Sequence, residues 1–328
     1  MADEYDVIVA GGGIAGLTAG VTSARLGRQT LVLTGGAPGG LLLSIEKIEG
    51  YPGFPDGVSG FELCPLTQEQ AALAGAAFSM AELHGVEPDG EGWRVSAADG
   101  ERLARAVVVA TGARLRELGV PGEEELRGRG VSHCASCDAP LFRERVVGVV
   151  GGGDSALQEA LTLADAVAEV VVLHRGDTLS AQASFQERVL AHPKIDVRYG
   201  TVVEEVLGDG TVSAVKVRHV ASGAASELEL GGLFVYVGLQ PNSDVLSDRL
   251  RLDDSGHVPT DAQMRTELPG LLAAGVVRRG AAGRAAGSAG DGAIAAIAAD
   301  RYLADGVWGD EAYAQAGAAA LGNGGRHA

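Results

Sequence analysis

The chain has 328 residues, of which 46% are hydrophobic and 21% charged, so it is long enough for two domains and its composition disfavours disorder. Its formal net charge of −17 at pH 7 argues against nucleic-acid and anionic-membrane partners, because both need a basic face. The acidic start lacks a signal-peptide pattern, no apolar run is long enough to span a bilayer, and three cysteines are too few for a secreted disulfide framework; together these features predict a soluble, cytoplasmic protein.

The first predicted elements form a strand–helix–strand unit. The continuous apolar run Tyr5–Ala10 is typical of a strand buried on both faces, and Gln29–Thr34 predicts a second strand. Residues 11–27 between them begin with glycines and continue with small and apolar residues at helical spacing. This pattern predicts a Rossmann-like βαβ unit, with Ile14 and Ala15 at the start of its helix.

Three glycines in the pattern G-x-G-x-x-G open this helix at Gly11, Gly13 and Gly16. The first permits a tight turn, the second lets backbone N–H groups approach a pyrophosphate, and the third lets the helix pack close to the strand. A tight turn without a ligand is the alternative. An acid that binds the ribose hydroxyls is expected at the end of the second strand, but the residue there is Thr34, which predicts a weaker or different grip.

The strand–glycine–helix pattern recurs in the middle of the chain. Arg145–Val150 and Ala168–Arg175 predict strands, and the helix between them opens with Gly151 and Gly153, followed by Ala156 in the third place. One such motif alone is weak evidence. Two of them, each between a predicted strand and helix, predict two nucleotide-binding domains.

Two connections join the predicted domains. The segment Ala106–Glu123 reads as a strand, a turn at Ala110, Thr111 and Gly112, and a Gly- and Pro-containing crossing; the chain returns near Asn242. We therefore predict an α/β fold of two Rossmann-like nucleotide-binding domains, the second inserted in the first. The first domain comprises residues 1–115 and 243–312, the inserted domain with the paired cysteines comprises residues 116–242, and residues 313–328 form a flexible tail.

The stretch around Cys134 and Cys137 has the pattern Cys-x-x-Cys, with Asp138 directly behind it. A zinc site needs four ligands, and neither Cys64 nor the histidines have suitable spacing. Two buried structural thiols are another alternative. A redox dithiol fits best, because such a pair can form a small disulfide and the adjoining acid can exchange protons. Cys64 reads as a small buried residue on a helix, and His133 either as a stabiliser of a thiolate or as a core residue.

Six segments resemble, in order, landmarks of the low-molecular-weight thioredoxin reductase family, within the pyridine nucleotide–disulfide oxidoreductases: GGGIAGLTAG, IEGYPGFPDGVSGFEL, VVVATGARLRELGVPGE, CASCDAPLF, GGGDSALQEA and SAGDGAIAAIAADRYL. The resemblance implies a flavoprotein, usually a homodimer, in which electrons pass from NADPH through FAD to a disulfide and then to thioredoxin. It implies that Cys137 is the thiol nearer the flavin, Cys134 the nucleophile and Asp138 the general acid.

The resemblance also implies a set of FAD-binding residues around the first glycine motif: Gly11, Gly13, Ile14, Ala15, Gly16, Thr34, Gly39, Gly40, Leu41, Ala110, Thr111, Gly112, Gly275, Val276, Arg284 and Ala285. The family has glutamine at Leu41, aspartate at Val276, and Arg-Gln-Ala where this chain has Gly283, Arg284 and Ala285. These departures predict FAD bound weakly, in a changed pose, or not at all, although the glycines still favour a flavin.

A second nucleotide site is implied at Gly151, Gly153, Asp154, Ser155, His174 and Arg175. The family motif His-Arg-Arg-x-x-x-Arg corresponds here to His174, Arg175, Gly176 and, at its last position, Ser180. Each arginine would give a 2′-phosphate charge-assisted hydrogen bonds worth ~1.5–3 kcal/mol, so losing two predicts poor NADPH binding. Arg175 sufficing alone and NADH replacing NADPH are the alternatives.

The main hypothesis from the sequence is a FAD-dependent thiol–disulfide oxidoreductase whose donor or acceptor is not standard NADPH but ferredoxin, another reduced carrier, or oxygen. The basic residues Arg278, Arg279 and Arg284 could dock an acidic carrier such as ferredoxin. The disulfide partner would be thioredoxin, a thioredoxin-like protein or a small dithiol. An ordinary NAD(P)H-dependent thioredoxin reductase and a catalytically degenerate binding or regulatory homologue are the alternatives.

Overall fold

The computed structural model describes residues 3–309, which divide into two compact units. The larger unit contains the described residues up to Ala113 and those from Pro241 onward, and the smaller unit is Arg114–Gln240. The sequence placed the crossings after residues 115 and 242. Each unit has parallel strands that alternate with helices, which confirms the predicted α/β class with two Rossmann-like parts. The predicted tail, residues 313–328, lies outside the described residues, as do residues 310–312.

The sheet of the larger unit has the strand order β3-β2-β1-β6-β5-β4, and β17 also pairs with β6. Val7 to Ala10 in β1 have no exposed surface, as the continuous apolar run predicted. The parallel strands are β1 (Asp3–Ala10), β2 (Thr30–Leu33), β3 (Ala77–Ser79), β6 (Gly100–Val109) and β17 (Leu271–Ala273). The antiparallel strands are β4 (Leu83–Asp89) and β5 (Gly92–Ala97).

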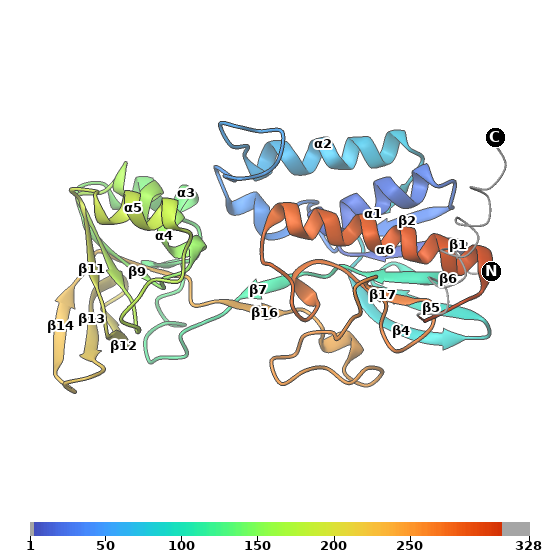
Figure 1. Cartoon of the computed structure of the whole chain (residues 1–328). Helices are drawn as coiled ribbons and strands as arrows, with labels where there is room; N and C mark the ends of the chain where they lie inside the picture. Colours follow the sequence, from blue (N-terminus) through green and yellow to red (C-terminus); the bar gives the residue numbers. More distant parts are fainter. Residues whose placement is uncertain (1–2, 310–328) are drawn as a thin grey trace, which may run out of the picture. The chain divides into compact units, whose positions relative to one another are not determined.

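Three long helices, α1 (Ile14–Arg25), α2 (Gly60–Leu73) and α6 (Ala285–Asp305), lie together on one side of the larger unit (Figure 1). Helix α2 begins after Ser59, whose hydroxyl accepts the Glu62 N–H at 3.1 Å and so caps the first turn. Helices α1 and α6 pack so closely that a Cβ added at Gly292 would lie 2.0 Å from the Ala15 carbonyl oxygen. The contact requires glycine at residue 292. The 3₁₀ turns of this unit are η1 (Gly40–Ser44), η3 (Asp244–Leu246) and η4 (Gly275–Val277).

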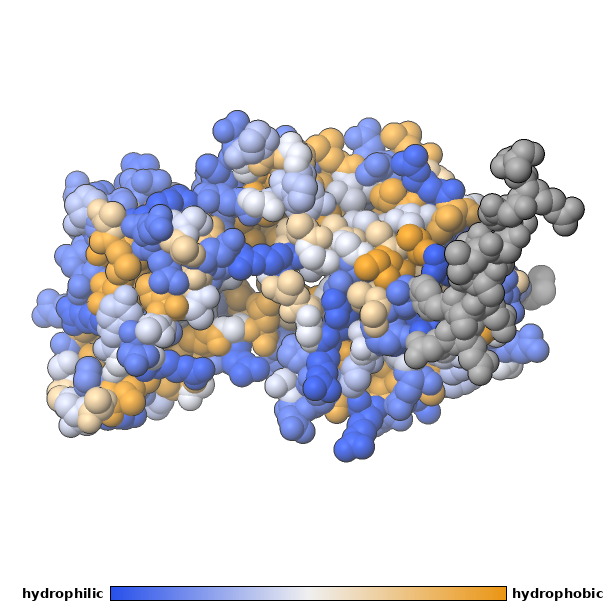
Figure 2. Space-filling model, in the orientation of Figure 1, coloured by the Kyte–Doolittle hydropathy of each residue, from blue (hydrophilic) through white to orange (hydrophobic). Residues whose placement is uncertain are grey.

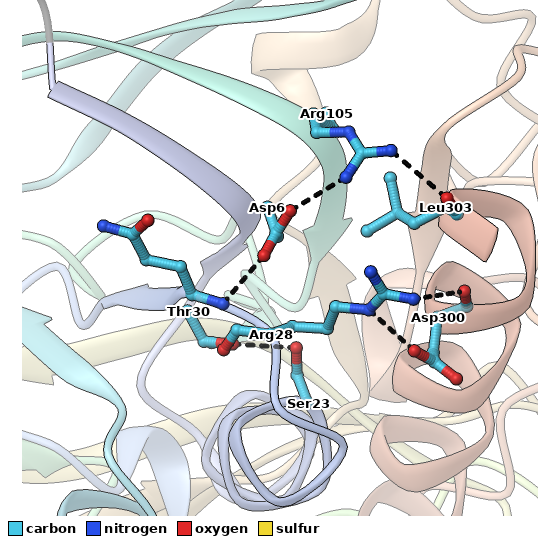
Figure 3. A network of polar contacts seen from close by, with 8 residues as sticks. Asp6, Ser23, Arg28, Thr30, Arg105, Asp300 and Leu303 are labelled. Carbon is cyan, nitrogen blue, oxygen red and sulfur yellow. Dashed lines mark hydrogen bonds and ion pairs between the residues drawn. The ribbon is translucent and has the colours of Figure 1, made fainter.

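Two arginines tie the returning helix α6 to the strands at the start of the chain (Figure 3). Arg28 Nε lies 2.7 Å from Asp300 Oδ1, and Arg28 Nη2 donates to the Asp300 carbonyl at 3.1 Å. Arg105 donates to Asp6 Oδ1 at 3.0 Å and to the Leu303 carbonyl at 3.2 Å. The last helix is therefore held to the first Rossmann unit by polar contacts as well as by apolar packing.

The smaller unit has a five-stranded parallel sheet in the order β11-β10-β9-β15-β8 and a separate antiparallel sheet of β12, β13 and β14. The parallel strands are β8 (Val131–Ser132), β9 (Val146–Val150), β10 (Glu169–Leu173), β11 (Ile195–Arg198) and β15 (Gly232–Val235). The helical segments are α3 (Ala135–Asp138), η2 (Ala139–Phe142), α4 (Asp154–Ala164) and α5 (Ala183–Leu190). The antiparallel strands are β12 (Thr201–Gly208), β13 (Val212–His219) and β14 (Ala225–Glu229).

The two chain crossings between the units pair with one another. Strands β7 (Ala113–Leu115) and β16 (Leu239–Pro241) form a two-stranded sheet of their own. Beyond β7, the buried carboxylate of Glu123 accepts the N–H groups of Leu118 at 2.9 Å and Gly119 at 2.7 Å. This carboxylate satisfies backbone donors in a segment that has no regular structure. No helix within residues 3–309 has the length and apolar character needed to cross a membrane.

Candidate active site

The first glycine motif forms a tight turn between β1 and α1. Gly11 has φ +129°, and a Cβ there would lie 2.1 Å from the Ala110 carbonyl oxygen. A Cβ on Gly16 would lie 1.9 Å from the Gly11 carbonyl oxygen, so the helix contacts the turn directly. Gly13 differs, because no atom lies within 4 Å of a Cβ added to it. Gly13 is also the N-cap of α1, so the helix N-terminus is open to an anion such as a pyrophosphate.

The segment after β2 folds against this turn. The N–H of Gly39 donates to the Gly12 carbonyl at 2.7 Å, and Gly39 and Gly40 both have positive φ, at +132° and +57°. The Thr34 hydroxyl donates to the Gly36 carbonyl at 2.7 Å, so its hydrogen is already used in a hydrogen bond within this loop. Leu41 follows at the start of η1 and is half-buried. The structure thus brings Thr34, Gly39 and Gly40 to the same end of the sheet as the glycine motif.

A second group of expected residues lies after β17. Gly275 has φ +77°, and a Cβ there would lie 2.8 Å from the Ala15 Cβ, so this turn also contacts the start of α1. The N–H of Gly275 donates to Asp291 Oδ2 at 3.2 Å. Arg278 donates to both carboxylate oxygens of Asp291, with Nε–Oδ2 2.7 Å and Nη2–Oδ1 2.8 Å. Asp291 was not anticipated, since an acid in an alanine-rich helix reads as a surface residue.

This ion pair corrects the expectation of a basic docking cluster. The Arg278 side chain is 16% exposed and bound to Asp291, so it does not offer a free positive charge to an acidic carrier. Arg279 and Arg284 are exposed. Arg284 is the N-cap of α6, and Ala285 begins that helix and packs with Ile14 in one apolar cluster.

The second glycine motif is built like the first. Gly151 has φ +149°, and a Cβ there would lie 2.4 Å from the Tyr236 carbonyl oxygen. Gly153 is the N-cap of α4, and the nearest atom to a Cβ added there is Ser180 Oγ at 3.7 Å. Asp154 in the first turn accepts Gln182 N–H at 2.7 Å and Gln182 Nε2 at 3.0 Å. The exposed Ser155 follows it.

The loop after β10 folds back over this motif. A Cβ on Gly152 would lie 2.2 Å from His174 Nδ1, so the imidazole occupies the space beside the glycine turn. His174 Nε2 lies 2.8 Å from the Thr178 carbonyl, and the Ser180 N–H donates to the Gly152 carbonyl at 2.8 Å. Arg175 is exposed next to this loop. Gly176 stands where the family motif has its second arginine. A Cβ on Gly176 would lie 2.9 Å from His174 Nε2.

The paired cysteines are bonded to each other. Cys134 and Cys137 form a disulfide with S–S 2.08 Å and Cα–Cα 5.3 Å. The Cys137 N–H lies 3.3 Å from Cys134 Sγ, because the bond spans the start of the short helix α3. Cys137 is exposed and Cys134 half-buried, so the alternative of two buried structural thiols is wrong. Asp138 is half-buried at the end of α3.

Cys64 and His133 do not take part in the disulfide, and each is held by its own contacts. Cys64 lies on α2 with no exposed surface, and burial raises the pKa of its thiol to about 11. His133 Nδ1 lies 3.0 Å from the Val235 carbonyl oxygen, which fixes the ring against β15. Within residues 3–309, no group of three or more His, Cys, Asp or Glu side chains could hold a metal ion.

Comparison with known proteins adds the family. The model of the family described as pyridine nucleotide-disulphide oxidoreductase matches residues 5–294. The chain belongs to this family. It is 39% identical to a thioredoxin reductase of Treponema pallidum, over 92% of this chain and 98% of that protein. It is also 39% identical to one of Streptomyces coelicolor, over 93% of this chain and 95% of that protein.

Solved structures in this oxidoreductase family agree. A thioredoxin reductase of Lactococcus lactis has a TM-score of 0.89 at 38% identity, covering 92% of this chain and 99% of its own. A thioredoxin reductase of T. acidophilum has a TM-score of 0.87 at 31% identity, covering 90% of this chain and 98% of its own. The resemblance to the low-molecular-weight thioredoxin reductases is confirmed, and the chain is a flavin-dependent disulfide oxidoreductase of that type.

The larger unit fits FAD at its glycine motif. No atom lies within 4 Å of a Cβ added at Gly13, the N-cap of α1, so the N-terminus of this helix is accessible to a pyrophosphate. The remaining part of the flavin would be held by Gly39 and Gly40, and by the turn that begins at Gly275. The side chains of Leu41 and Val276 offer it no hydrogen bond.

Proposed function

We propose that this oxidoreductase reduces a disulfide of thioredoxin or a thioredoxin-like protein with electrons from a reduced nicotinamide nucleotide. The Cys134–Cys137 disulfide, in a chain that matches thioredoxin reductases over nearly its whole length, carries this proposal. FAD, when bound, would supply the two-electron step between the nicotinamide and the disulfide. The similarity of about 39% to thioredoxin reductases supports this ordinary reaction over the ferredoxin- or oxygen-linked one expected from the sequence.

Cys134 and Cys137 would carry out different steps of the thiol–disulfide exchange. Once reduced, the Cys134 thiolate would attack the partner disulfide, and one sulfur of the partner would leave with a proton from Asp138. The Cys137 thiolate would then attack Cys134 in the mixed disulfide, which restores the Cys134–Cys137 bond and releases the partner as a dithiol. Cys134→Ser should abolish turnover, while Cys137→Ser should trap the mixed disulfide, detectable by mass spectrometry. Unchanged turnover in either variant would contradict the assignment.

Anaerobic titration tests the proposal as a whole. The purified protein should show a flavin spectrum that NADH or NADPH bleaches, and it should then reduce added thioredoxin. A protein that takes up no FAD, or whose flavin neither nucleotide bleaches, contradicts the proposal. Bleaching by dithiothreitol but by neither nucleotide would favour another electron carrier.

A second candidate, the same reaction with NADH as the preferred donor, is favoured by the loop after β10. An arginine beside the ribose is what recognises a 2′-phosphate in such folds. In this loop Arg175 is exposed next to Gly176, the acidic Asp177 is exposed as well, and the Ser180 hydroxyl donates to the Gly152 carbonyl at 3.3 Å. The ratio of kcat/KM for the two nucleotides distinguishes the donors.

We also infer that the chain acts as a homodimer. Apolar side chains gather over α2 in the larger unit (Figure 2), where Phe61, Leu66 and Leu73 are 70%, 50% and 83% exposed. Such large exposed apolar side chains in one region are typical of a covered surface. Light scattering of the wild-type protein should give twice the mass of one chain. The double variant Phe61→Glu, Leu73→Glu should give the mass of a single chain. A monomeric wild-type protein contradicts this inference.

A further inference from the structure

The two glycine motifs are alike in the residue that follows the second strand of each βαβ unit. Thr34 follows β2 and lies against Gly12, where an added Cβ would be 2.7 Å from the Thr34 Cβ. His174 follows β10 and lies against Gly152, where an added Cβ would be 2.2 Å from the His174 Nδ1. In nucleotide-binding folds of this kind the residue at this place holds the ribose hydroxyls, and it is usually an acid. His174 therefore has the position of a ribose-binding residue in the smaller unit.

The hydrogen bond of the imidazole fixes which of its nitrogens carries a hydrogen. Nε2 lies 2.8 Å from the Thr178 carbonyl oxygen, and a carbonyl only accepts, so Nε2 is the donor. The neutral ring then has a lone pair and no hydrogen on Nδ1. Within residues 3–309 no hydrogen bond to Nδ1 is formed, and Nδ1 is not among the fully buried polar atoms that lack a partner. Nδ1 is therefore an accessible acceptor.

Backbone and aromatic contacts hold the imidazole in this orientation. The His174 N–H donates to the Arg198 carbonyl at 3.0 Å, and the Thr201 N–H donates to the His174 carbonyl at 2.9 Å. The Tyr199 ring meets the imidazole at an interplanar angle of 84°, with 6.4 Å between the centroids. Glycine at residue 152 has no side chain to cover the Nδ1–Cε1 edge of the ring, which faces it. The acceptor thus has a defined place beside the glycine turn.

The helix that follows the same turn is open at its N-terminus. Gly153 is the N-cap of α4, and the nearest atom to a Cβ added there is Ser180 Oγ, at 3.7 Å. The Ser180 hydroxyl donates to the Gly152 carbonyl at 3.3 Å, so its hydrogen is used within the turn. A pyrophosphate at this N-terminus and a ribose at the end of the second strand are the two contacts by which such a fold holds a dinucleotide.

The charges near this place do not favour a phosphate on the ribose. Arg175 and Asp177 are both exposed in the loop after β10, and their charges are opposite. Arg198 Nε lies 3.1 Å from Asp196 Oδ2, which compensates the charge of the arginine. A 2′-phosphate carries about two negative charges and acceptor oxygens, which would face the lone pair of the imidazole. A 2′-hydroxyl instead has a hydrogen to donate to that lone pair.

We propose that His174 selects the electron donor: its Nδ1 accepts the 2′-hydroxyl of the adenosine ribose, so the smaller unit takes a dinucleotide without a 2′-phosphate, NADH rather than NADPH. This inference rests on the proposed function in placing the nicotinamide donor at the second glycine motif. The missing arginines at residues 176 and 180 deprive NADPH of favourable contacts. His174 adds a contact that only the unphosphorylated ribose can make.

Ligands that carry no electrons test the inference apart from the redox reaction. The full-length protein is kept saturated with FAD, so that calorimetric titrations with ADP, 2′-deoxy-ADP and ADP bearing a 2′-phosphate report on the second motif. Wild-type protein should bind ADP about fivefold more tightly than 2′-deoxy-ADP, because the deoxy ligand leaves Nδ1 without its partner. It should bind ADP about tenfold more tightly than the 2′-phosphorylated ligand.

The variant His174→Gln separates the roles of the two ring nitrogens. A glutamine amide can still donate to the Thr178 carbonyl but has no acceptor at the place of Nδ1. Its affinities for ADP and 2′-deoxy-ADP should be equal, since the side chain and the ligand hydroxyl no longer interact. His174→Asn, whose carbonyl oxygen can take the place of Nδ1, should restore part of the preference for ADP. His84→Gln, at an exposed position on β4, is the matched control and should bind all three ligands as the wild type does.

Equal wild-type affinities for ADP and 2′-deoxy-ADP would overturn the inference, and so would a ratio that His174→Gln leaves unchanged. The wild-type comparison needs no variant, so it decides the matter if His174→Gln does not fold. Absence of ADP binding in the FAD-saturated protein would remove the nucleotide site and the inference with it. A flavin that NADPH bleaches as readily as NADH contradicts the inference alone, whereas a flavin that neither nucleotide bleaches contradicts the proposed function.

Discussion

Arg278 and Asp291 form a two-point ion pair inside the larger unit, with Nε–Oδ2 2.7 Å and Nη2–Oδ1 2.8 Å. The same Oδ2 accepts the Gly275 N–H at 3.2 Å, so one carboxylate joins α6 to the turn after β17. Asp291→Asn should lower the free energy of unfolding by about 2 kcal/mol, because the buried guanidinium loses its charged partner. Urea unfolding measures this. Arg279→Ala, at an exposed position, is the control, and equal stability of both variants would contradict the role of the pair.

Gly290 and Gly292 offer a matched pair of substitutions on α6. A Cβ at Gly292 would lie 2.0 Å from the Ala15 carbonyl oxygen, whereas a Cβ at Gly290 would meet nothing within 4 Å. Gly292→Ala should therefore separate α1 from α6 and lower the Tm. Gly290→Ala should raise the stability by about 0.5–1 kcal/mol, because alanine favours the helix. Thermal unfolding distinguishes them, and similar Tm values would mean that the helices do not pack as described.

A substitution at Gly13 should affect the binding of FAD without affecting the folding of the protein. A Cβ at this position has open space around it, so Gly13→Ala should fold as the wild type does when FAD is absent. It should bind FAD at least tenfold more weakly, since the methyl group occupies the approach of the pyrophosphate to the helix N-terminus. The FAD content and the Tm of the FAD-free protein are the two measurements. Unchanged affinity would place the pyrophosphate elsewhere.

Residues 176 and 180 control the nucleotide preference if the smaller unit binds the donor. Gly176→Arg together with Ser180→Arg should raise kcat/KM for NADPH relative to NADH by about tenfold or more, because each charged hydrogen bond to the 2′-phosphate contributes ~1.5–3 kcal/mol. A Cβ at Gly176 comes within 2.9 Å of His174 Nε2, so the His174–Thr178 contact must yield. Ser180→Arg alone is the milder control. A preference that does not change would argue against a nicotinamide at this loop.

Cys64 should react slowly and in a pH-dependent way. Only the thiolate is alkylated, and the pKa of about 11 keeps this thiol protonated at neutral pH. At pH 8, iodoacetamide should label Cys64 at least 100-fold more slowly than in urea, where the pKa is ~8.5. The folded pKa is the higher one, so this thiol stabilises the fold fully below about pH 8.5 and loses that contribution as the pH rises toward 11. Equal labelling rates in both states would contradict its burial.

Much of the parallel framework could be predicted, because buried parallel strands leave continuous apolar runs and glycine motifs leave fixed spacings. The runs in β1, β9 and β10 were read correctly, as were the helices behind both glycine motifs. The antiparallel strands β4, β5 and β12 to β14 were missed. In β5, β12 and β13 buried residues are separated by more exposed ones, and β4 and β14 are mostly exposed or half-buried, so none of them has the continuous apolar run of a buried parallel strand.

Side-chain partnerships were beyond reach of the sequence. Arg278 reads as part of a free basic cluster until Asp291, thirteen residues later, is seen to pair with it. His174 is predicted as a nucleotide contact, and its residue type gave no sign that its ring lies beside Gly152 with Nε2 at the Thr178 carbonyl. Such pairings depend on how separate segments meet in space, and residue type alone does not encode that.

The pairing of β7 with β16 has a consequence for how the chain can be rearranged. Because the polypeptide enters and leaves residues 114–240 at adjacent points, this segment is a cassette with neighbouring ends. It can be excised and replaced by a short hairpin loop, or exchanged for the corresponding segment of a relative, without rethreading the larger unit. The Cys134–Cys137 disulfide lies on this segment, and so does the proposed donor site; we therefore expect both to be exchangeable without changing the proposed flavin site.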